Sequence, residues 1–549
     1  MLDSLEKKIS HARTASKTTG ALPFDDIREL ILKRKGNQGR FLIFYDDLGN
    51  RTEFSYEKFC ELVLKTASFL QKKGLTRGDR ISTISHNHWH TVVHYFASWL
   101  LGLVVVPVNL GEDDSRIKYI LRTGNVKLAF VRDQYKSRIE QILHSGSDPE
   151  SAEPVYCDES SSAFTSDEKE LSLPDDSLPE SEALIVFTSG TTGPPKAVVL
   201  TQKNLLEDAR SIAGWHNINS DTRMMCVLPI HHVNGTVVTL LTPFFAGGSV
   251  VLNQKFSTQH FFPVVEKENV HIVSVVPTLL QYLSHYYTER PKPESGSLRH
   301  IICGAGPLTV SVAETFEESL GIRIIHGYGL SETTCYSCFV PCGLASEEHR
   351  KWRSEFGYPS IGIPLPINEM AIHDTEGRML SEKERGEIVI RGVNVMKGYF
   401  NNREANLKAF KNGWFRSGDE GFYLRDDTGR SYFFITGRLK ELIIRGGVNL
   451  SPLEIDEVIN RAPGVKAGIA VGFENEWYGE EVGAYVALKE NREPDSKAIL
   501  DFCRKHLPFS KCPKAVVFGD EIPVTSTGKY QRVKVAHLFE EWKEKQFRK

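Results

Sequence analysis

The segment FTSGTTGPPKAVVLT, from Phe187 to Thr201, sets a loop of glycine, hydroxyl residues and lysine between two apolar runs. Glycines allow backbone N–H groups to turn towards an anion, and the hydroxyl and lysine side chains add donors and positive charge. The spacing fails the Walker pattern GxxxxGK[ST], because Gly190 to Gly193 is followed by Pro-Pro-Lys-Ala. The loop is therefore predicted to hold phosphate, but not as in standard P-loop kinases and GTPases. The alternative is a flexible turn between two strands.

Apolar strand-like runs alternate with amphipathic helical runs, which is typical of α/β architecture with mostly parallel sheets. Predicted strands are Val104–Val108, Ala183–Thr188, Ala197–Leu200, Ile272–Val276 and His300–Cys303, and predicted helices are Tyr56–Lys73 and Thr309–Leu320. The segment Ser145–Glu182, rich in Ser, Asp, Glu and Pro, is predicted to be a solvated connection. Past Gly386, runs such as GEIVIRG and SYFFITGR predict antiparallel strands, followed by a small separate domain.

The overall composition is that of an ordinary multidomain protein. A chain of 549 residues is too long for one hydrophobic core, so at least two domains are expected. A net charge of -3, from 67 basic and 70 acidic residues, gives no indication of a nucleic-acid partner. The longest apolar run, Tyr95–Leu110, is shorter than the roughly 20 residues of a membrane span, and predicts the end of a buried helix followed by a buried strand. The charged N-terminus shows no signal peptide, and nine cysteines are expected to be reduced thiols in the cytoplasm.

Further motifs follow the opening loop along the chain. They are LPIHHVNG (Leu228–Gly235), GAGP (Gly304–Pro307), GYGLSETT (Gly327–Thr334), GWFRSGD (Gly413–Asp419), TGRLKELIIRGGVN (Thr436–Asn449) and PVTSTGK (Pro523–Lys529). With them, the chain from about Phe54 to Val535 resembles the adenylate-forming superfamily of acyl-CoA synthetases, peptide-synthetase adenylation domains and beetle luciferases. The resemblance implies a large N-terminal domain of stacked, mostly parallel sheets with helices plus a small distorted β-barrel, and a small mobile α+β domain. The domain limits are then 1–439 and 440–549, with a hinge at Lys440.

The resemblance also implies a reaction in two steps. A carboxylate attacks the α-phosphate of ATP to give acyl-AMP and pyrophosphate, and a thiol then attacks the acyl carbon. Glu332 would ligate Mg²⁺, a hard cation that prefers oxygen donors. The β- and γ-phosphates would be held by Thr188, Ser189, Gly190, Thr191, Thr192, Gly193 and Lys196. The residues expected near adenine are Gly304, Ala305, Gly306, Tyr328 and Gly329. Thr333 is expected near the α-phosphate, and Asp419 and Arg438 are expected to bind the ribose.

Two lysines carry the catalytic predictions. The ammonium of Lys529 is expected to bridge the attacking carboxylate and the α-phosphate, which offsets the repulsion between two anions. Rotation about Lys440 would then remove Lys529 and bring Gly446 and Gly447 to the site, opening a channel for the pantetheine of CoA. The resemblance also implies that His232 takes part in the acylation site, whereas no role is assigned to its neighbour His231.

The acyl pocket implied by the family layout is mainly small and apolar, with one amide. Its residues are Val233, Asn234, Ser274, Gly304, Gly329, Leu330 and Cys335. This set fits a medium-chain, aromatic or polycyclic acid, and it offers no evident partner for the ammonium of an amino acid. The LPIHHVNG and GGVN strings resemble the CoA-ligase branch of the superfamily, so an ATP-dependent acid–CoA ligase is expected. The alternatives are an enzyme that loads the phosphopantetheine of an acyl carrier protein, a luciferase-like oxidase, and a degenerate binder.

Two clusters of metal-binding residue types compete with this interpretation. Cys335, Cys338 and Cys342 form CxxCxxxC, but a fourth soft ligand is not evident and cysteine is a common buried residue. His86, His88, His90 and His94 form the second cluster, in which His90 and His94 share one helical face. We expect neither cluster to bind a metal, and we interpret the histidines as structural or surface residues.

Overall fold

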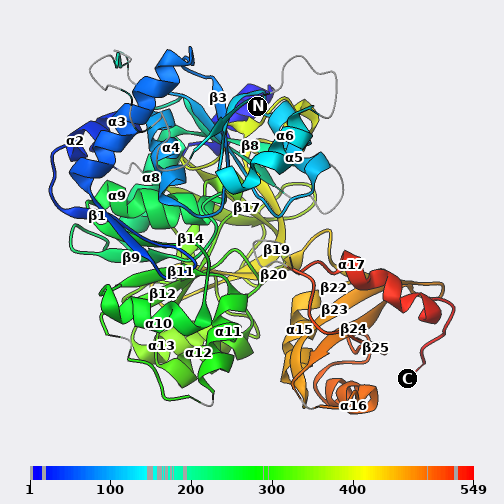
Figure 1. The fold of residues 1–549 in the computed structure, drawn as a ribbon. Helices are drawn as coiled ribbons and strands as arrows, with labels where there is room; N and C mark the ends of the chain where they lie inside the picture. Colours follow the sequence, from blue (N-terminus) through cyan, green and yellow to red (C-terminus); the bar gives the residue numbers. More distant parts are fainter. Residues whose placement is uncertain are drawn as a thin grey trace.

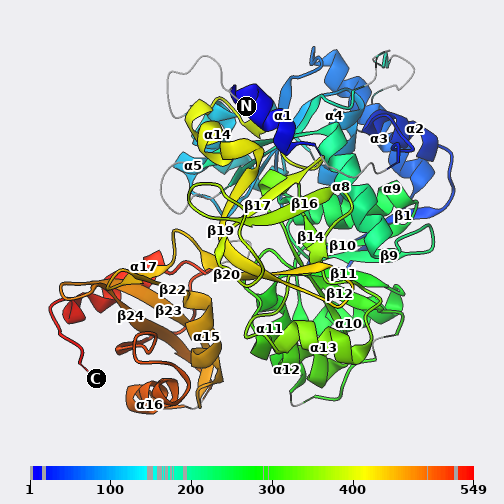
Figure 2. The ribbon, with the colours of Figure 1, turned by 180° about the vertical axis from the view of Figure 1, so that it is seen from behind.

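The computed structural model of the chain describes residues 4–14, 20–144, 152–157, 164, 166, 171–173, 176, 178–188, 195–288, 290–294, 296–490, 492–524 and 530–548. These residues form a large α/β body with three sheets and a smaller α+β body built on a fourth sheet. The smaller body, orange to red in Figure 1, stands beside the large one, and Figure 2 shows the same arrangement from behind. The predicted fold class is confirmed.

The largest sheet has nine strands and is parallel through its centre. In spatial order they are β15 (Ile363–Pro364), β14 (Cys338–Phe339), β13 (Ile324–Tyr328), β12 (His300–Cys303), β11 (Ile272–Val275), β9 (Arg223–Cys226), β10 (Ser249–Asn253), β1 (Arg40–Tyr45) and β2 (Arg51–Ser55). Antiparallel pairs occur only towards its edges, at β13–β14–β15 and at β1–β2. The central strands are continuous apolar runs because both faces of a parallel sheet are covered.

A second sheet of seven strands carries the opening loop at one end. In spatial order its strands are β18 (Gly398–Tyr399), β8 (Lys196–Thr201), β7 (Glu182–Thr188), β4 (Val104–Val108), β3 (Arg80–Ile84), β5 (Val126–Val131) and β6 (Glu153–Tyr156). The strands from β6 to β7 are parallel, whereas β7, β8 and β18 pair antiparallel. Because β7 ends at Thr188 and β8 begins at Lys196, the opening loop joins two adjacent strands.

Helices fill the space between the two sheets and cover their outer faces. Along β1, Leu42 and Phe44 face a core shared by both sheets, while Ile43 and Tyr45 face a second core, as the two-residue period of a strand requires. The shared core contains α3 (Tyr56–Lys72), α4 (Trp89–Leu100) and α8 (Gln202–Trp215). The second core lies under α10 (Thr258–Lys267), α11 (Pro277–Tyr287) and α12 (Val310–Leu320), and α5 (Asp114–Thr123) and α6 (Lys136–His144) cover the other sheet.

The third sheet of the large body is a four-stranded antiparallel sheet. Its strands are β16 (Asn368–His373), β17 (Gly386–Gly392), β19 (Phe415–Arg425) and β20 (Ser431–Arg438). The described part of the large body also contains α1 (Leu5–Ala12), α2 (Ile27–Arg34), α9 (Thr242–Ala246), α13 (Ser346–Ser354) and α14 (Arg403–Ala409). This sheet places β20 directly before the smaller body.

The smaller body has its own cores, distinct from those of the large body. Its sheet contains β22 (Val448–Leu450), β21 (Ile443–Arg445), β24 (Gly479–Leu488), β23 (Val465–Asn475) and β25 (Ala515–Phe518), and its helices are α15 (Pro452–Arg461), α16 (Ser496–His506) and α17 (Val533–Ala536). Polar contacts link it to the large body. The backbone N–H of Ser311 donates to Glu457 at 3.0 Å, and the Tyr358 hydroxyl donates to Glu454 at 3.3 Å.

The predicted strands and helices all occur, with ends that differ by at most a residue, and the run Tyr95–Leu110 forms the end of α4 followed by β4. One prediction is wrong in part. The segment Ser145–Glu182 contains strand β6, which pairs in parallel with β5, although much of that segment lies outside the described residues. Its composition indicated a loop because an edge strand of four residues needs few apolar side chains. Among the residues that the structure describes, no helix combines the length and apolarity of a membrane span.

Candidate active site

Three predicted site segments meet at the carboxyl edge of the nine-stranded sheet. Ser274 lies near the carboxyl end of β11, Gly304 directly follows β12, and Gly329 directly follows β13. These strands are parallel neighbours, so the loops that follow them gather at one edge, which is where open α/β sheets bind ligands. The sheet thus brings the predicted adenine and acyl segments together.

The predicted acyl-pocket residues form a connected polar chain. The Ser274 hydroxyl donates to Asn234 Oδ1 at 2.8 Å, and Asn234 Nδ2 donates to the Tyr336 hydroxyl at 3.2 Å. Asn234 opens a π-helix, Asn234–Leu241, a conformation that is often found at functional sites. Gly304 has to be glycine here, because a Cβ would lie 2.6 Å from the Tyr336 hydroxyl oxygen. Tyr336 is a site residue that the sequence analysis missed.

A strained turn shapes the segment that follows β13. Thr334 has φ +64° and ψ −62°, and the Cys335 N–H donates to the Thr333 carbonyl at 2.7 Å, which defines a γ-turn of the rare, strained form. Gly329 packs against the same turn, since a Cβ there would lie 1.9 Å from the Cys335 carbonyl oxygen. Thr333 and Cys335 are buried, and Leu330 is half-buried.

A buried polar network holds this turn. The Asn394 amide nitrogen lies within hydrogen-bond distance of Asp208 Oδ1 (2.9 Å) and of the Thr333 (3.1 Å) and Tyr336 (2.9 Å) carbonyls. The Thr334 hydroxyl donates to the Asn394 carbonyl at 2.6 Å. Burial raises the pKa of Asp208 to about 8, so its carboxyl is largely protonated at neutral pH. Strain at Thr334 therefore persists because Asn394, itself bonded to Asp208, holds Thr333 and Tyr336 on either side of the turn and accepts from Thr334.

The predicted ribose site is assembled around Asp419. The Tyr328 hydroxyl donates to Asp419 Oδ2 at 2.7 Å, and Arg438 Nε donates to Oδ1 at 3.0 Å. Asp419 and Arg438 are opposite each other on β19 and β20, while Tyr328 ends β13. Burial and the Asp419 charge both raise the pKa of Tyr328, which remains a neutral hydroxyl donor. These residues come from distant motifs and lie together in the structure. The roles predicted for Tyr328 at adenine and for Asp419 and Arg438 at the ribose stay predictions.

A second polar group lies at the predicted metal and phosphate position. The Tyr399 hydroxyl donates to Glu332 Oε1 at 2.9 Å, and the Lys196 ammonium lies 4.7 Å from the centroid of the Tyr399 ring. Burial lowers the pKa of Lys196, while the Glu332 charge acts in the opposite direction. Glu332 is half-buried, so its carboxylate is an accessible oxygen donor of the kind that Mg²⁺ prefers. Tyr399 had no predicted role, and no local motif singles it out.

Part of the predicted phosphate and catalytic set lies outside the described residues. This part consists of Ser189, Gly190, Thr191, Thr192, Gly193 and Lys529. The described ends of the opening loop are Thr188 and Lys196, which face each other across the β7–β8 pair. On the C-terminal side, Val524 and Tyr530 form an isolated antiparallel bridge.

The predicted hinge and channel residues are exposed. Lys440 lies in the turn between β20 and β21, and Gly446 and Gly447 form the turn between β21 and β22 with φ of +56° and +81°. The charge of Lys440 contributes to the lowered pKa of Lys196, so the two lysines are electrostatic neighbours in this conformation. The structure therefore places the predicted hinge turn in the neighbourhood of Lys196.

The predicted acylation histidine lies beside the pocket helix. His232 precedes Val233 and the π-helix, and its ring centroid is 4.4 Å from that of His231. Ala305 and Gly306 complete the loop after β12, where Ala305 adopts a left-handed φ of +61°. Val233 is buried, as expected for a residue of an apolar pocket.

The histidine cluster around α4 packs into the protein interior. His94 stacks on Phe130 at 3.7 Å, and Arg132 contacts His90. Burial lowers the pKa of His88 and His90 to about 2, so these imidazoles are neutral. The prediction of structural histidines fits this packing, while their predicted surface alternative does not, since His88, His90 and His94 are buried.

Comparison with known proteins agrees with this geometry. The profile of AMP-binding enzymes matches residues 33–400, and that of the AMP-binding enzyme C-terminal domain matches residues 454–529. A sulfoacetate–CoA ligase of Cupriavidus necator is 33% identical over 465 residues, which cover 84% of this chain and 88% of that protein. An oxalate–CoA ligase of Arabidopsis thaliana is 32% identical over 508 residues, 90% of this chain and 95% of that one.

A solved structure agrees in fold as well. The o-succinylbenzoate CoA synthetase of Bacillus subtilis, in complex with its acyl-adenylate intermediate, superposes with a TM-score of 0.79 and 26% identity, over 95% of this chain and 98% of that one. The profile match spans well over half of the chain, and the two curated relatives exceed 30% identity over most of it. The chain therefore belongs to the family of AMP-binding enzymes.

Proposed function

We propose that the protein is an ATP-dependent acid–CoA ligase. A carboxylic acid and ATP would give acyl-AMP and pyrophosphate, and the thiol of CoA would then give the acyl-CoA and AMP. The observation that carries the proposal is the convergence of Tyr328, Asp419 and Arg438 beside the Glu332–Tyr399–Lys196 group, both in contact with the GYGLSETT segment. The curated relatives named above are CoA ligases, which supports the same reaction.

Each polar group would serve one part of the nucleotide. Asp419, held by Tyr328 and Arg438, would accept hydrogen bonds from the ribose hydroxyls, for which a fixed carboxylate is suited. Lys196 would approach the β- and γ-phosphates from the end of the opening loop. Glu332 would hold Mg²⁺, and the bound ion would neutralise phosphate charge. Lys529 would bridge the acid and the α-phosphate, and Thr333 would contact the α-phosphate.

The lining residues favour an acid with an uncharged acyl part. The proposed pocket residues Val233, Asn234, Ser274, Leu330 and Cys335 include no cationic side chain. Sulfoacetate and oxalate, the acids in the names of the two relatives, each carry a second anionic group that would need a positive partner. We therefore propose a medium-chain or aromatic acid, with the Ser274–Asn234–Tyr336 chain offering a hydrogen bond at one end of the pocket.

The acceptor would be CoA, and the alternative acceptor is the phosphopantetheine of an acyl carrier protein. The curated relatives support CoA. The nine cysteines of the chain are free thiols in the structure, which fits a reducing compartment. We accordingly place the reaction in the cytoplasm.

Pyrophosphate release with ATP, Mg²⁺ and a panel of acids tests the first step, and the formation of acyl-CoA or acyl-carrier thioester tests the second. We expect acid-dependent pyrophosphate release, and thioester formation with CoA. Lys529→Ala should slow adenylate formation by about 100-fold or more, because it removes the charge at the reacting centre. Lys534→Ala, at an exposed lysine nearby, is the matched control. Acid-independent pyrophosphate release, or equal rates in the two variants, would contradict the proposal.

A further inference from the structure

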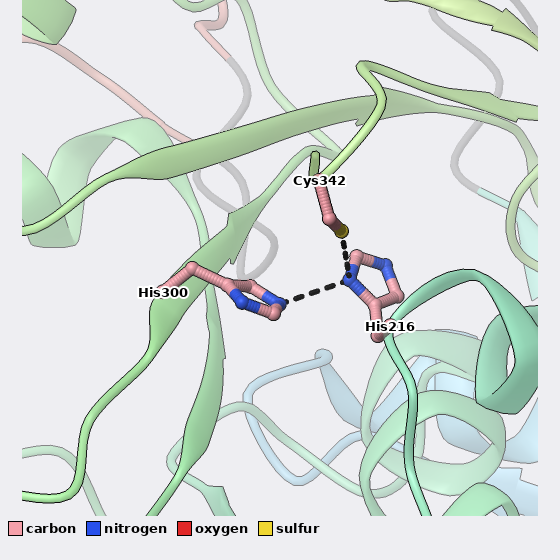
Figure 3. A group of neighbouring side chains, drawn as sticks. All are labelled: His216, His300 and Cys342. Carbon is pink, nitrogen blue, oxygen red and sulfur yellow. Dashed lines mark hydrogen bonds between the residues drawn. The ribbon is translucent and has the colours of Figure 1, made fainter. Parts of the chain in front are cut away.

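Two histidines and a cysteine meet on the side of the large body away from the nucleotide motifs. Figure 3 shows His216, His300 and Cys342 pointing their ring nitrogens and sulfur at one another from three separate segments. His216 Nδ1 lies 3.0 Å from His300 Nε2 and 3.5 Å from Cys342 Sγ. One ligand atom from each residue lies within 4.8 Å of the other two, and this is the only such group of three found among the described residues.

The cluster is remote from the edge of the sheet that carries the adenylation motifs. His300 begins β12, whereas Gly304 follows the carboxyl end of the same strand. His216 caps the carboxyl end of α8, and Cys342 lies in the turn after β14. The group therefore joins three elements of the core and has no part in the proposed reaction.

Hydrogen bonding alone leaves this cluster poorly satisfied. The Nδ1 atom of a neutral imidazole either donates one hydrogen or accepts one, yet two partners approach His216 Nδ1. The other nitrogen of that ring, Nε2, is buried without a hydrogen-bond partner among the described residues. Burial lowers the pKa of His216 and lowers that of His300 to about 4, so both rings are neutral and keep a lone pair at neutral pH.

We propose that His216, His300 and Cys342 form a binding site for a thiophilic metal ion of the closed-shell type, Cu⁺ or Zn²⁺. Imidazole nitrogen and cysteine sulfur are the ligands that these ions prefer. Ion–ligand bonds of about 2.0 to 2.3 Å place neighbouring ligand atoms roughly 3.3 to 3.6 Å apart. The two separations at His216 Nδ1, 3.0 Å and 3.5 Å, need to change by only a few tenths of an ångström, and the third pair, His300 and Cys342, lies within 4.8 Å. On binding, the Cys342 S–H bond breaks, sulfur bonds to the ion, and the proton passes to water.

The surroundings of the sulfur favour the monovalent ion. Arg323 donates to the Cys342 carbonyl oxygen at 3.3 Å. Burial raises the pKa of the Cys342 thiol to about 11, and the charges of Arg299 and Arg323 oppose that rise. These positive charges stabilise a thiolate but oppose a site with net positive charge. A Cu⁺–thiolate pair is neutral, whereas a Zn²⁺–thiolate pair keeps one positive charge. Zn²⁺ would in addition need a fourth ligand, which water could supply because Cys342 is only partly buried.

The proposal is tested on the reduced, chelator-treated full chain without oxygen. Each ion is titrated alone against a competing chromophoric chelator, and the loaded protein is examined by X-ray absorption. We expect one ion per chain, tighter retention of Cu⁺ than of Zn²⁺, and a spectrum with one sulfur and two imidazole ligands. Two results with the wild-type protein alone would overturn the proposal. One is an X-ray absorption spectrum that shows no sulfur ligand, and the other is that neither ion binds at micromolar protein concentration.

Two substitutions and a control locate the site. Cys342→Ser and His300→Gln should each weaken binding by about 10-fold or more, since either removes one ligand. Cys60→Ser changes a buried thiol on α3, and should retain wild-type affinity. Thermal unfolding with and without the ion shows whether each variant is folded, and the ion should raise the midpoint only where the ligand set is intact. Equal affinity in wild type and Cys342→Ser would overturn the assignment. Because ATP and acid are absent, the result is independent of the proposed ligase activity.

Discussion

The Tyr399 hydroxyl donates a 2.9 Å hydrogen bond to the Glu332 carboxylate, while its ring lies against the ammonium of Lys196. One tyrosine thus orients the predicted metal ligand and packs against the predicted phosphate lysine. The contact exists because β18 adds to β8, with Tyr399 opposite Val198. This pairing ties the segment after β17 to the end of the opening loop.

Tyr399→Phe should keep the ring beneath Lys196 but release the Glu332 carboxylate from its donor. A hydrogen bond to a charged acceptor contributes about 1.5 to 3 kcal/mol, so we expect adenylate formation to slow by about 10-fold or more. The Mg²⁺ concentration for half-maximal rate should also rise. Pyrophosphate release measured across a Mg²⁺ titration checks both effects.

The control is Tyr432→Phe, since the Tyr432 hydroxyl is buried without a hydrogen-bond partner among the described residues and packs on Trp352. That variant should keep the wild-type rate and Mg²⁺ dependence. If the two tyrosine variants behaved alike, Tyr399 would have no special relation to Glu332.

Asp208→Asn should alter how stability depends on pH. Burial raises the pKa of Asp208 from 3.8 to about 8. Between these two pH values the folded state keeps the proton on Asp208, whereas the unfolded state has released it. Wild-type stability should therefore fall as pH rises from about 4 to 8, by at most roughly 1.4 kcal/mol per pH unit from this group. The asparagine variant lacks this loss, because its neutral amide can still accept from Asn394.

Urea unfolding of both proteins at several pH values provides the measurement. The difference in unfolding free energy should change in favour of Asp208→Asn as pH increases. If the unfolding free energies of the two proteins changed in parallel across the whole pH range, Asp208 would not have a raised pKa. Adenylate formation by the variant should stay near wild type at low pH, since the network around Thr334 remains connected.

Gly329→Ala should damage the site through sterics alone. The new Cβ would lie 1.9 Å from the Cys335 carbonyl oxygen, so the γ-turn at Thr334 would have to move. A displacement of about 1 Å at a reacting centre can cost about 100-fold in rate, and we expect a loss of that order in adenylate formation. Gly343→Ala, where nothing lies within 4 Å of a Cβ, is the matched control and should retain activity. Full activity in Gly329→Ala would show that the turn tolerates displacement.

The buried strands could be predicted from sequence because they are apolar runs with little ambiguity. Val104–Val108 and His300–Cys303 occur as β4 and β12 with the predicted ends. Tyr399 could not be predicted, because it lies 67 residues from Glu332 on a strand of two residues whose pairing depends on tertiary structure. The role of Asp208 was hidden for the same reason, since its partner Asn394 is 186 residues away.

The cysteine motif shows a different limit of sequence reasoning. Cys335, Cys338 and Cys342 are close in sequence, but Cys338 lies on β14 with its thiol towards the Tyr328 carbonyl, while Cys342 reaches His216. Cys338 is held on a strand paired on both sides, whereas Cys342 lies in the turn that follows this strand, so the two thiols have different partners. The histidines that approach Cys342 are 84 residues apart, so no spacing rule would have joined them.

Lys440→Pro should separate the two half-reactions. The turn around Lys440 is held by N–H groups of Leu439, Glu441 and Leu442, so proline at 440 removes none of these hydrogen bonds. Proline fixes its own φ and restricts the residue before it, and would therefore prevent rotation about the proposed hinge. We expect acid-dependent pyrophosphate release to stay within about 3-fold of wild type, while thioester formation from isolated acyl-AMP falls by about 100-fold or more. Lys440→Ala removes the same ammonium near Lys196 but leaves φ free, so it should retain both half-reactions. Equal losses in the two half-reactions of Lys440→Pro would indicate that the turn supports the site in this conformation, not a change of conformation between steps.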